Sequence, residues 1–180
     1  MFSIILRRVN IVVEAGRFRL LNLPFYSMFS DEYFMGHALK EAVKAADSED
    51  VPVGAVIVYK NHIIGRGCNQ VELLKDPTAH AEMIVVTQAA NHLGAKWLKD
   101  CVLYVTIEPC SMCAGALVLS RIDRVVFGAP DPKTGAGGSV LNILHHAKLN
   151  HQIKVKGGVL EQECAGLLQD FFRKQRAKNN

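Results

Sequence analysis

The sequence lacks the features of a membrane-spanning or disulfide-rich protein. No uncharged apolar run in its 180 residues approaches the roughly 18 residues that a membrane helix needs. Its five cysteines are an odd number, which does not suit a disulfide framework and favours a reducing compartment such as the cytoplasm. Strong charge of one sign is also absent, because the formal net charge is only +4. The 49% of hydrophobic residues instead predicts one globular domain.

Residues 1–29 contain little acid and differ from the rest, with four arginines against one glutamate. Arg7 and Arg8 interrupt their apolar run and no small-residue cleavage pattern follows, so a secretory signal is not favoured. An arginine-rich, acid-poor leader is typical of an organellar transit peptide, and a true start at Met28 is the other interpretation. In both cases we expect residues 1–29 to lie outside the fold. Import into an organelle would follow only if these residues are a transit peptide.

From residue 30 to about 176 the sequence alternates predicted helices and strands. Ser30 is a good N-cap and two acids follow it, which predicts a helix that ends near Asp47-Ser48. The remaining helices are expected at 80–93, 111–119 and from about 161. Apolar, mostly β-branched runs predict strands at 53–59, 62–69, 102–106, 123–127 and 153–155. This order favours an α/β fold, a three-layer α/β/α sandwich with a central mixed five-stranded sheet and no second domain.

Apolar residues recur at helical spacing in two of these helices, and we expect the faces they form to be buried. The first helix has two rows with a period of four, which are Phe34, Ala38, Ala42 and Met35, Leu39, Val43. The helix at 80–93 has one apolar face, made of Met83, Val86, Ala90 and Leu93.

Two stretches near the end of the chain each have two interpretations. The last ten residues, including a basic tail at 177–180, have four cations and no acid. They could contact a polyanion, or form a solvated helix end where cations suit the helix dipole. The glycine-rich loop at 133–139 is not a phosphate loop, because no Gly-Lys-Ser/Thr closes it onto a helix. It is either a surface loop or a substrate lid.

One histidine and two cysteines suggest a metal site. Cys110 and Cys113 are separated by two residues, so both thiolates can reach one ion. They sit at a predicted helix N-terminus, where free N–H groups and the dipole lower a thiol pKa. His80 also begins a predicted helix. Because no convincing fourth ligand is near them in sequence, the set predicts a catalytic zinc with one position for water.

Glu82 lies two residues after His80 and is placed to move protons. Zinc lowers the pKa of a bound water to about 7. Glu82 could take a proton from that water and deliver it to a leaving group. This combination suits hydrolytic attack on an amidine-like carbon, with ammonia leaving.

Other uses of the same residues fit less well. A thioredoxin-type redox pair at Cys110 and Cys113 would leave the His-Ala-Glu segment unexplained. A structural zinc would need a fourth ligand. If His80 were an ordinary core histidine, its occurrence together with Glu82 and the Pro-Cys-x-x-Cys segment would be a coincidence. The other three cysteines, Cys68, Cys101 and Cys164, are expected to be ordinary core residues.

Together these residues form the pattern H-x-E…P-C-x-x-C, which resembles the signature of the zinc nucleobase deaminases. Further segments resemble the bacterial tRNA-specific adenosine deaminases (TadA type) of the cytidine/deoxycytidylate deaminase superfamily. These segments are 76–82, 106–116, 125–129, 131–136, 145–146, 150–151 and 171–173. The resemblance runs from residue 30 to about 176 and leaves out residues 1–29.

The resemblance implies a cytidine-deaminase-like fold and a specific reaction. The reaction would be hydrolytic deamination of adenosine to inosine at the wobble position, 34, of a tRNA anticodon. One zinc ion per subunit would be held by His80, Cys110 and Cys113, and Glu82 would be the proton shuttle. A homodimer is also implied, with the anticodon stem-loop contacting both subunits.

Substrate contacts are implied as well. Asn69 resembles a residue that contacts the flipped purine nucleoside, and the backbone of Ala81 and Cys110 would help to place the base. Further contacts are implied at two loop positions near the anticodon backbone and on the last helix, namely Asp131, Lys133, Phe171, Phe172 and Arg173. Pro130 and Pro132 depart from the family pattern and stiffen the loop around Asp131. A single-stranded anticodon loop can present its base at low cost, and the basic C-terminus would then contact phosphates.

Two other functions stay open at this point. A small-molecule deaminase would act on cytosine, guanine or a nucleotide with the same zinc motif. A zinc-stapled RNA-binding module would keep the metal but have no catalysis.

Overall fold

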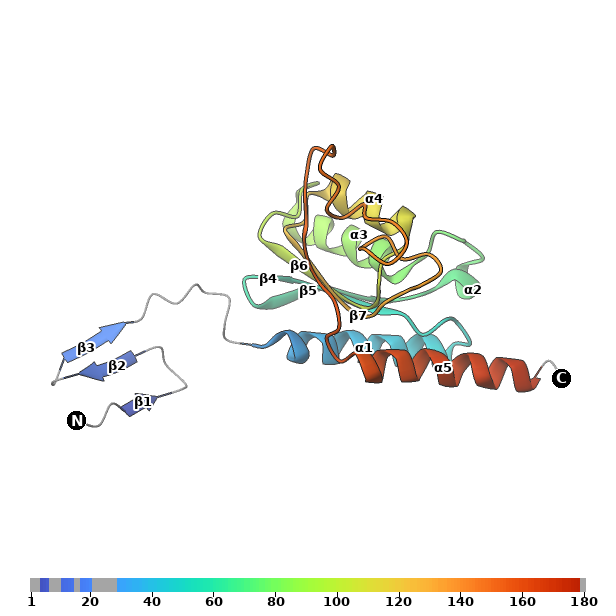
Figure 1. The fold of residues 1–180 in the computed structure, drawn as a ribbon, viewed down its shortest axis with the longest axis horizontal. Coiled ribbons are helices and arrows are strands. Elements are labelled where there is room, and N and C mark those ends of the chain that lie inside the picture. The colour runs from blue at the N-terminus through green and yellow to red at the C-terminus, as the bar shows by residue number, and fades with distance from the viewer. Residues whose placement is uncertain (1–3, 7–10, 15–16, 21–28, 179–180) are drawn as a thin grey trace.

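The computed structural model describes residues 4–6, 11–14, 17–20 and 29–178, with side chains described from residue 29 (Figure 1). Strands β1 (Ile4–Leu6), β2 (Ile11–Glu14) and β3 (Arg17–Leu20) form an antiparallel sheet of their own. Among the described elements, these strands contact only one another. The expectation that 1–29 is a leader or precedes a start at Met28 falls largely outside the described residues, so it stays a prediction.

The main sheet has five strands in the order β5-β4-β6-β7-β8. Strand β4 is antiparallel to β5 and β6, whereas β6, β7 and β8 are parallel to one another. The mixed five-stranded sheet predicted from sequence is therefore confirmed. The strand bounds are Gly54–Tyr59 for β4, His62–Cys68 for β5, Cys101–Ile107 for β6, Arg124–Ala129 for β7 and Lys154–Lys156 for β8.

Helices cover both faces of this sheet, which gives the predicted three layers (Figure 1). Helices α1 (Asp31–Asp47) and α5 (Glu161–Lys178) lie on one face. Helices α3 (Ala81–Leu93) and α4 (Ser111–Ser120) lie on the other. The one-turn helix α2 (Val71–Leu74) lies between the predicted strand at 62–69 and the predicted helix at 80–93, where no helix was predicted. Helix α5 continues to Lys178, so part of the expected tail at 177–180 is helical.

Helix α1 begins as its sequence predicts, because the Ser30 side chain accepts the Tyr33 N–H at 3.2 Å. Its first apolar row is buried throughout, but the second ends outside the core, with Val43 45% exposed. Gly54 explains the close contact of this helix with the sheet. A Cβ atom there would lie 2.1 Å from the backbone oxygen of Ala38, so only glycine fits.

The buried face of α3 differs from the one expected. Ala81, Val85 and Ala89 are fully buried, whereas the four predicted residues are only half-buried. The reason lies in β5, where a Cβ atom on Gly65 would come within 2.9 Å of the Val85 backbone. The missing side chain lets the helix approach at Val85 and turns that row toward the sheet.

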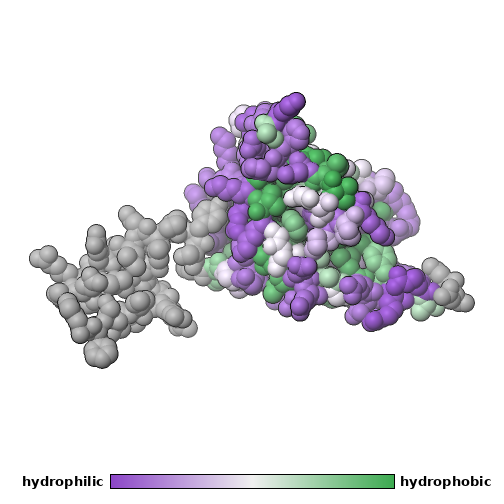
Figure 2. Space-filling model, viewed as in Figure 1, coloured by the Kyte–Doolittle hydropathy of each residue, from purple (hydrophilic) through white to green (hydrophobic). Residues whose placement is uncertain are grey.

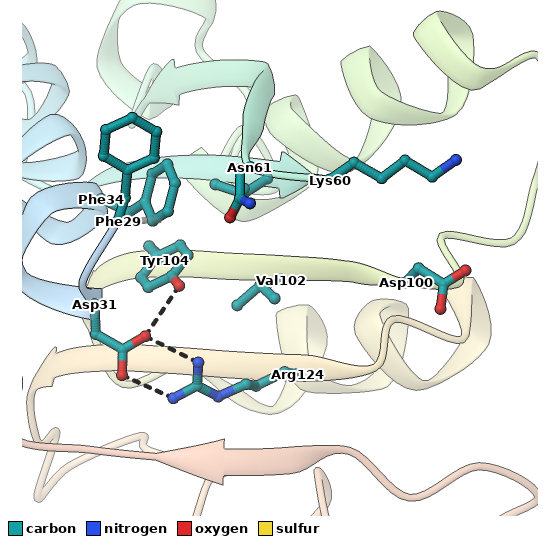
Figure 3. Close-up of a pocket in the computed structure, with 10 residues that line it drawn as sticks. Phe29, Asp31, Phe34, Lys60, Asn61, Asp100, Val102, Tyr104 and Arg124 are labelled. Carbon is teal, nitrogen blue, oxygen red and sulfur yellow. Dashed lines mark hydrogen bonds and ion pairs between the residues drawn. The ribbon is translucent and has the colours of Figure 1, made fainter. Parts of the chain in front are cut away.

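The network around Asp31 fixes the start of α1 to the sheet. Arg124 donates two hydrogen bonds to its carboxylate, at 2.9 and 2.8 Å, and Tyr104 donates one at 3.0 Å (Figure 3). These residues line a cavity of about 200 Å³. Phe34 of α1 and residues of the sheet, such as Val58 and Val102, also line it. None of the predicted site residues lines this cavity. No helix in the described part of the chain is long and apolar enough to cross a membrane.

Candidate active site

The three predicted ligands meet between the N-termini of α3 and α4. His80 is the N-cap of α3, and Cys110 is the N-cap of α4. The Nδ1 atom of His80 lies 3.7 Å from the sulfur of Cys110 and 3.5 Å from that of Cys113. The parallel pairing of β6 with β7 puts the start of α4 at the carboxyl end of the sheet, where α/β proteins bind ligands.

This cluster has the dimensions of a metal site. The three ligand atoms all lie within 4.8 Å of one another, and within the described ranges no further His, Cys, Asp or Glu joins them. A tetrahedral zinc with ordinary bond lengths requires nitrogen–sulfur separations of about 3.6 Å. The observed separations of 3.5 and 3.7 Å fit that value. The site can therefore hold a metal ion with three protein ligands.

Electrostatics concentrate negative charge on one sulfur atom, that of Cys110. Hydrogen bonds from Cys113 and His80 stabilise the Cys110 thiolate and lower its pKa from 9.0 to about 4. The pKa of Cys113 is raised, chiefly by its hydrogen bond to Cys110, and the pKa of His80 is raised by the same thiolate. A metal ion binds the thiolate and not the thiol, so the low pKa of Cys110 favours metal binding.

Glu82 lies in the first turn of α3 and is 3% exposed. Burial raises its pKa, and the backbone N–H at the helix start and the charge of His80 offset this only in part. A glutamate whose pKa is raised can hold and release a proton closer to neutral pH. Its place beside the cluster fits the predicted proton shuttle.

Asn69 is buried beside the same helix start, at 7% exposure. The next residue, Gln70, donates its backbone N–H to Ala79 at 3.0 Å, which joins this segment to the residue before His80. The Asn69 side chain donates from Nδ2 to Asp50 at 2.8 Å. Asp50 is 1% exposed, and no pattern in the sequence predicted its role.

The glycine-rich loop is held by Glu108, a second buried carboxylate that was not predicted from the sequence. Glu108 is 2% exposed and stands two residues before Cys110. It accepts hydrogen bonds from the backbone N–H groups of Asp131, Gly137 and Ser139, at 3.0, 2.8 and 3.0 Å, and from the Ser139 hydroxyl. The only sequence signal was an acid at the end of an apolar strand, where burial requires a partner.

The predicted contact residues in this loop differ in their surroundings. The carboxylate of Asp131 caps its own turn, accepting the N–H groups of Lys133 and Thr134 at 2.9 and 3.2 Å. Burial raises the pKa of Asp131, but the hydrogen bond from Thr134 and the two N–H groups outweigh it. Lys133 is exposed.

Phe171, Phe172 and Arg173 lie on α5, on the opposite face of the sheet from the ligand cluster. The two rings are 5.5 Å apart, and Phe172 is 44% exposed. Lys178 pairs with Glu49 at 2.5 Å, which places the end of α5 next to the turn that contains Asp50. Figure 2 shows hydrophilic residues over this part of the molecule. The chain thus brings these residues to the same end as the site, without placing them in the ligand cluster.

The other cysteines have no part in the cluster. Cys101 and Cys164 are buried, as expected, and burial raises the pKa of each to about 12. Cys68 is only half-buried, so the expectation of a core residue holds for it in part.

Comparison with known proteins gives a consistent family. Residues 29–176 match the family model described as MafB19-like deaminase. The tRNA-specific adenosine deaminase of Bacillus subtilis (strain 168) is 50% identical over 151 residues, which cover 84% of this chain and 94% of that protein. The corresponding protein of Aquifex aeolicus (strain VF5) is 52% identical over 145 residues, 81% of this chain and 95% of that one.

A solved structure supports the fold. It comes from work on A-to-I editing by tRNA:A34 deaminases at the wobble position of transfer RNA. It has a TM-score of 0.73 and 42% identity, and the match covers 76% of this chain and 99% of that chain. The predicted cytidine-deaminase-like fold is therefore confirmed.

Proposed function

The chain belongs to the family of tRNA-specific adenosine deaminases, and we propose on this basis that it converts adenosine to inosine at position 34 of a tRNA anticodon. The observation that carries the proposal is the meeting of His80, Cys110 and Cys113 beside the buried carboxyl of Glu82. The reaction consumes water and adenosine and releases ammonia and inosine.

His80, Cys110 and Cys113 would hold one zinc ion per subunit. Two sulfurs and one imidazole nitrogen are a donor set that zinc favours, and their spacing fits a tetrahedral ion. Bound there, zinc would lower the pKa of a water to about 7 and supply a nucleophile at neutral pH.

Glu82 would move the proton from the attacking water to the purine and then to the departing amino group. Burial raises its pKa toward the operating pH, which suits a group that must both accept and return a proton. Position in the first turn of α3 keeps it next to the ligand cluster. A buried site also excludes bulk water, which strengthens each interaction within it.

Recognition of the RNA would divide between the site and its surroundings. Asn69 and the backbone of Ala81 would hold the flipped adenine, and the loop carrying Asp131 and Lys133 would meet the anticodon backbone. The exposed aromatic and basic residues of α5 would touch neighbouring nucleotides by stacking and charge. We further propose a homodimer that binds the anticodon stem-loop with both subunits, and a cytoplasmic location, since all five cysteines are free.

The test is incubation of the purified protein with an anticodon stem-loop that has adenosine at position 34, followed by sequencing. Inosine is read as guanosine, so conversion appears as an A-to-G change at that position. A stem-loop with adenosine only at another loop position is the matched control. Ammonia release from free guanine or cytosine, with unchanged RNA, would establish the small-molecule alternative. RNA binding without any conversion by zinc-loaded protein would establish the non-catalytic module.

A further inference from the structure

The carboxylate of Asp50 is fully enclosed in the turn between α1 and β4 and is used by three N–H donors. Its Oδ1 atom accepts the Val51 N–H at 2.9 Å and the Asn69 side-chain Nδ2 at 2.8 Å. Its Oδ2 atom accepts the Glu72 N–H at 2.8 Å. Only 1% of the surface of Asp50 is exposed, so water has almost no access to this side chain.

An ionised carboxylate can only accept hydrogen bonds. The amide of Asn69 must therefore turn its NH₂ group toward Asp50, and the reversed amide would bring two oxygens together. Its backbone is also held, because the Asn69 N–H donates to Val53 at 2.9 Å. The second N–H and the carbonyl oxygen of the amide are left for other partners. The contact with Asp50 fixes on which side of the amide each of them lies.

We propose that Asp50 is a positioning residue that fixes which way round the Asn69 amide faces the base. This inference rests on the proposed function, since it takes Asn69 to be a substrate contact. A reversed amide would exchange its donor and its acceptor and would no longer match the edge of the purine. When buried polar groups of a site find no hydrogen-bond partner on the substrate, the rate for that substrate falls strongly.

A double-mutant cycle tests the proposal. Asp50→Asn, Asn69→Ala and the double variant are compared with the wild type for kcat and KM on the position-34 stem-loop. Asp50→Asn allows both amide orientations, so we expect kcat/KM to fall about tenfold. In the Asn69→Ala background the same change should have no further effect. An equal loss in both backgrounds would show that Asp50 acts only on folding and would overturn the proposal.

Asp47→Asn is the matched control, because Asp47 is exposed at the end of the same helix. It should leave kcat/KM unchanged. If it reduces kcat/KM as much as Asp50→Asn does, loss of negative charge in this region explains the effect and the positioning role is excluded.

The exchanged pair, Asp50→Asn with Asn69→Asp, covers the case in which Asp50→Asn alone fails to fold. It restores the contact between positions 50 and 69 with donor and acceptor reversed, but the Val51 N–H loses its acceptor. The protein should therefore fold with reduced stability and remain poorly active. Wild-type activity in the exchanged pair would overturn the proposal.

The inference can fail separately from the proposed function. If the wild type deaminates only a free base, the tRNA function fails, and the same cycle on that base still measures the coupling. The side-chain NH₂ signals of Asn69 in a ¹⁵N NMR spectrum test the pair without any substrate. They should exchange slowly with solvent in the wild type and faster in Asp50→Asn. Exchange as fast as that of exposed asparagines in the wild type would contradict the proposal.

Discussion

The carboxylate of Glu108 accepts the backbone N–H of Ser139 at 3.0 Å, and this contact ties the glycine-rich loop to the segment that leads into Cys110. The loop is also joined to that segment by the Ala136 N–H, which donates to the Pro109 carbonyl at 2.8 Å. Burial raises the pKa of Glu108, but the donors from the loop outweigh it and lower the pKa overall. The loop at 133–139 is therefore fixed beside the ligand cluster.

Replacing Glu108 with glutamine should loosen this loop. A glutamine side chain has one acceptor oxygen, and its NH₂ group would face backbone N–H donors. We expect the free energy of unfolding to fall by about 1–3 kcal/mol. Amide hydrogen exchange in residues 131–139, measured by mass spectrometry, should become faster. The exposed Glu163→Gln is the control. Unchanged exchange in the loop would show that Glu108 does not hold it.

Removing the carboxyl of Glu82 should abolish catalysis and leave RNA binding intact. General acid–base groups typically contribute about 10²- to 10⁴-fold to the rate, so Glu82→Ala and Glu82→Gln should lose kcat by that factor. Single-turnover deamination and fluorescence anisotropy measure the two properties, and metal analysis checks the zinc content. Activity of Glu82→Gln within tenfold of the wild type would rule out the proton shuttle.

Metal removal should stop the reaction reversibly. Chelation should abolish deamination, and added zinc should restore it, since the three ligand atoms lie close together and zinc binds them in their deprotonated forms. Cys113→Ala should lose bound zinc as well as activity, whereas Cys68→Ala should keep both, because Cys68 lies outside the cluster. Full activity of the metal-free protein would contradict the proposal that the reaction needs a metal ion at this cluster.

Acid should weaken the fold through Asp31. Burial alone raises the pKa of Asp31, but hydrogen bonds from Arg124 and Lys156 lower it from 3.8 to about 2. Because the folded pKa is below the unfolded one, this contribution is present above pH 3.8 and is lost as pH falls through 2. Asp31→Asn should lower the free energy of unfolding at neutral pH by at most about 2 kcal/mol.

Denaturant titrations of wild type and Asp31→Asn at several pH values measure that contribution. The difference between the two proteins should shrink as the pH falls from 4 toward 2. A difference that stays constant over this range would mean that the ionised carboxylate is not what stabilises the wild type.

The basic end of α5 should make RNA binding depend on salt. Arg173 and Lys174 are exposed, and each phosphate contact releases counterions. Changing both to alanine should weaken binding and reduce the slope of log K against log salt by about one unit for each phosphate contact that is lost. Lys96 and Lys99, which lie against Trp97, provide a matched pair of exposed cations. An equal change in slope for that pair would assign the effect to overall charge.

Much of this protein follows from short-range sequence patterns. The Ser30 cap, the β-branched runs and the spacing of Cys110 and Cys113 each act within a few residues, so they predict elements and a ligand set directly. The candidate metal ligands could be paired across the chain only because His-x-Glu and Pro-Cys-x-x-Cys resemble one signature. That resemblance also supplied the RNA substrate, which periodicity and spacing alone do not indicate.

Tertiary structure decided which buried and partly buried carboxylates have which partners. Asp50 meets Asn69 across 19 positions, Glu108 meets Ser139 across 31, and Asp31 meets Arg124 across 93. Such pairs depend on strand register and on how closely a helix approaches the sheet, as Gly65 shows for α3. Local periodicity in the sequence predicts neither the strand register nor the distance between a helix and the sheet. The sequence thus determined the fold class and the candidate metal ligands, and only the packed sheet determined how the residues around them are held.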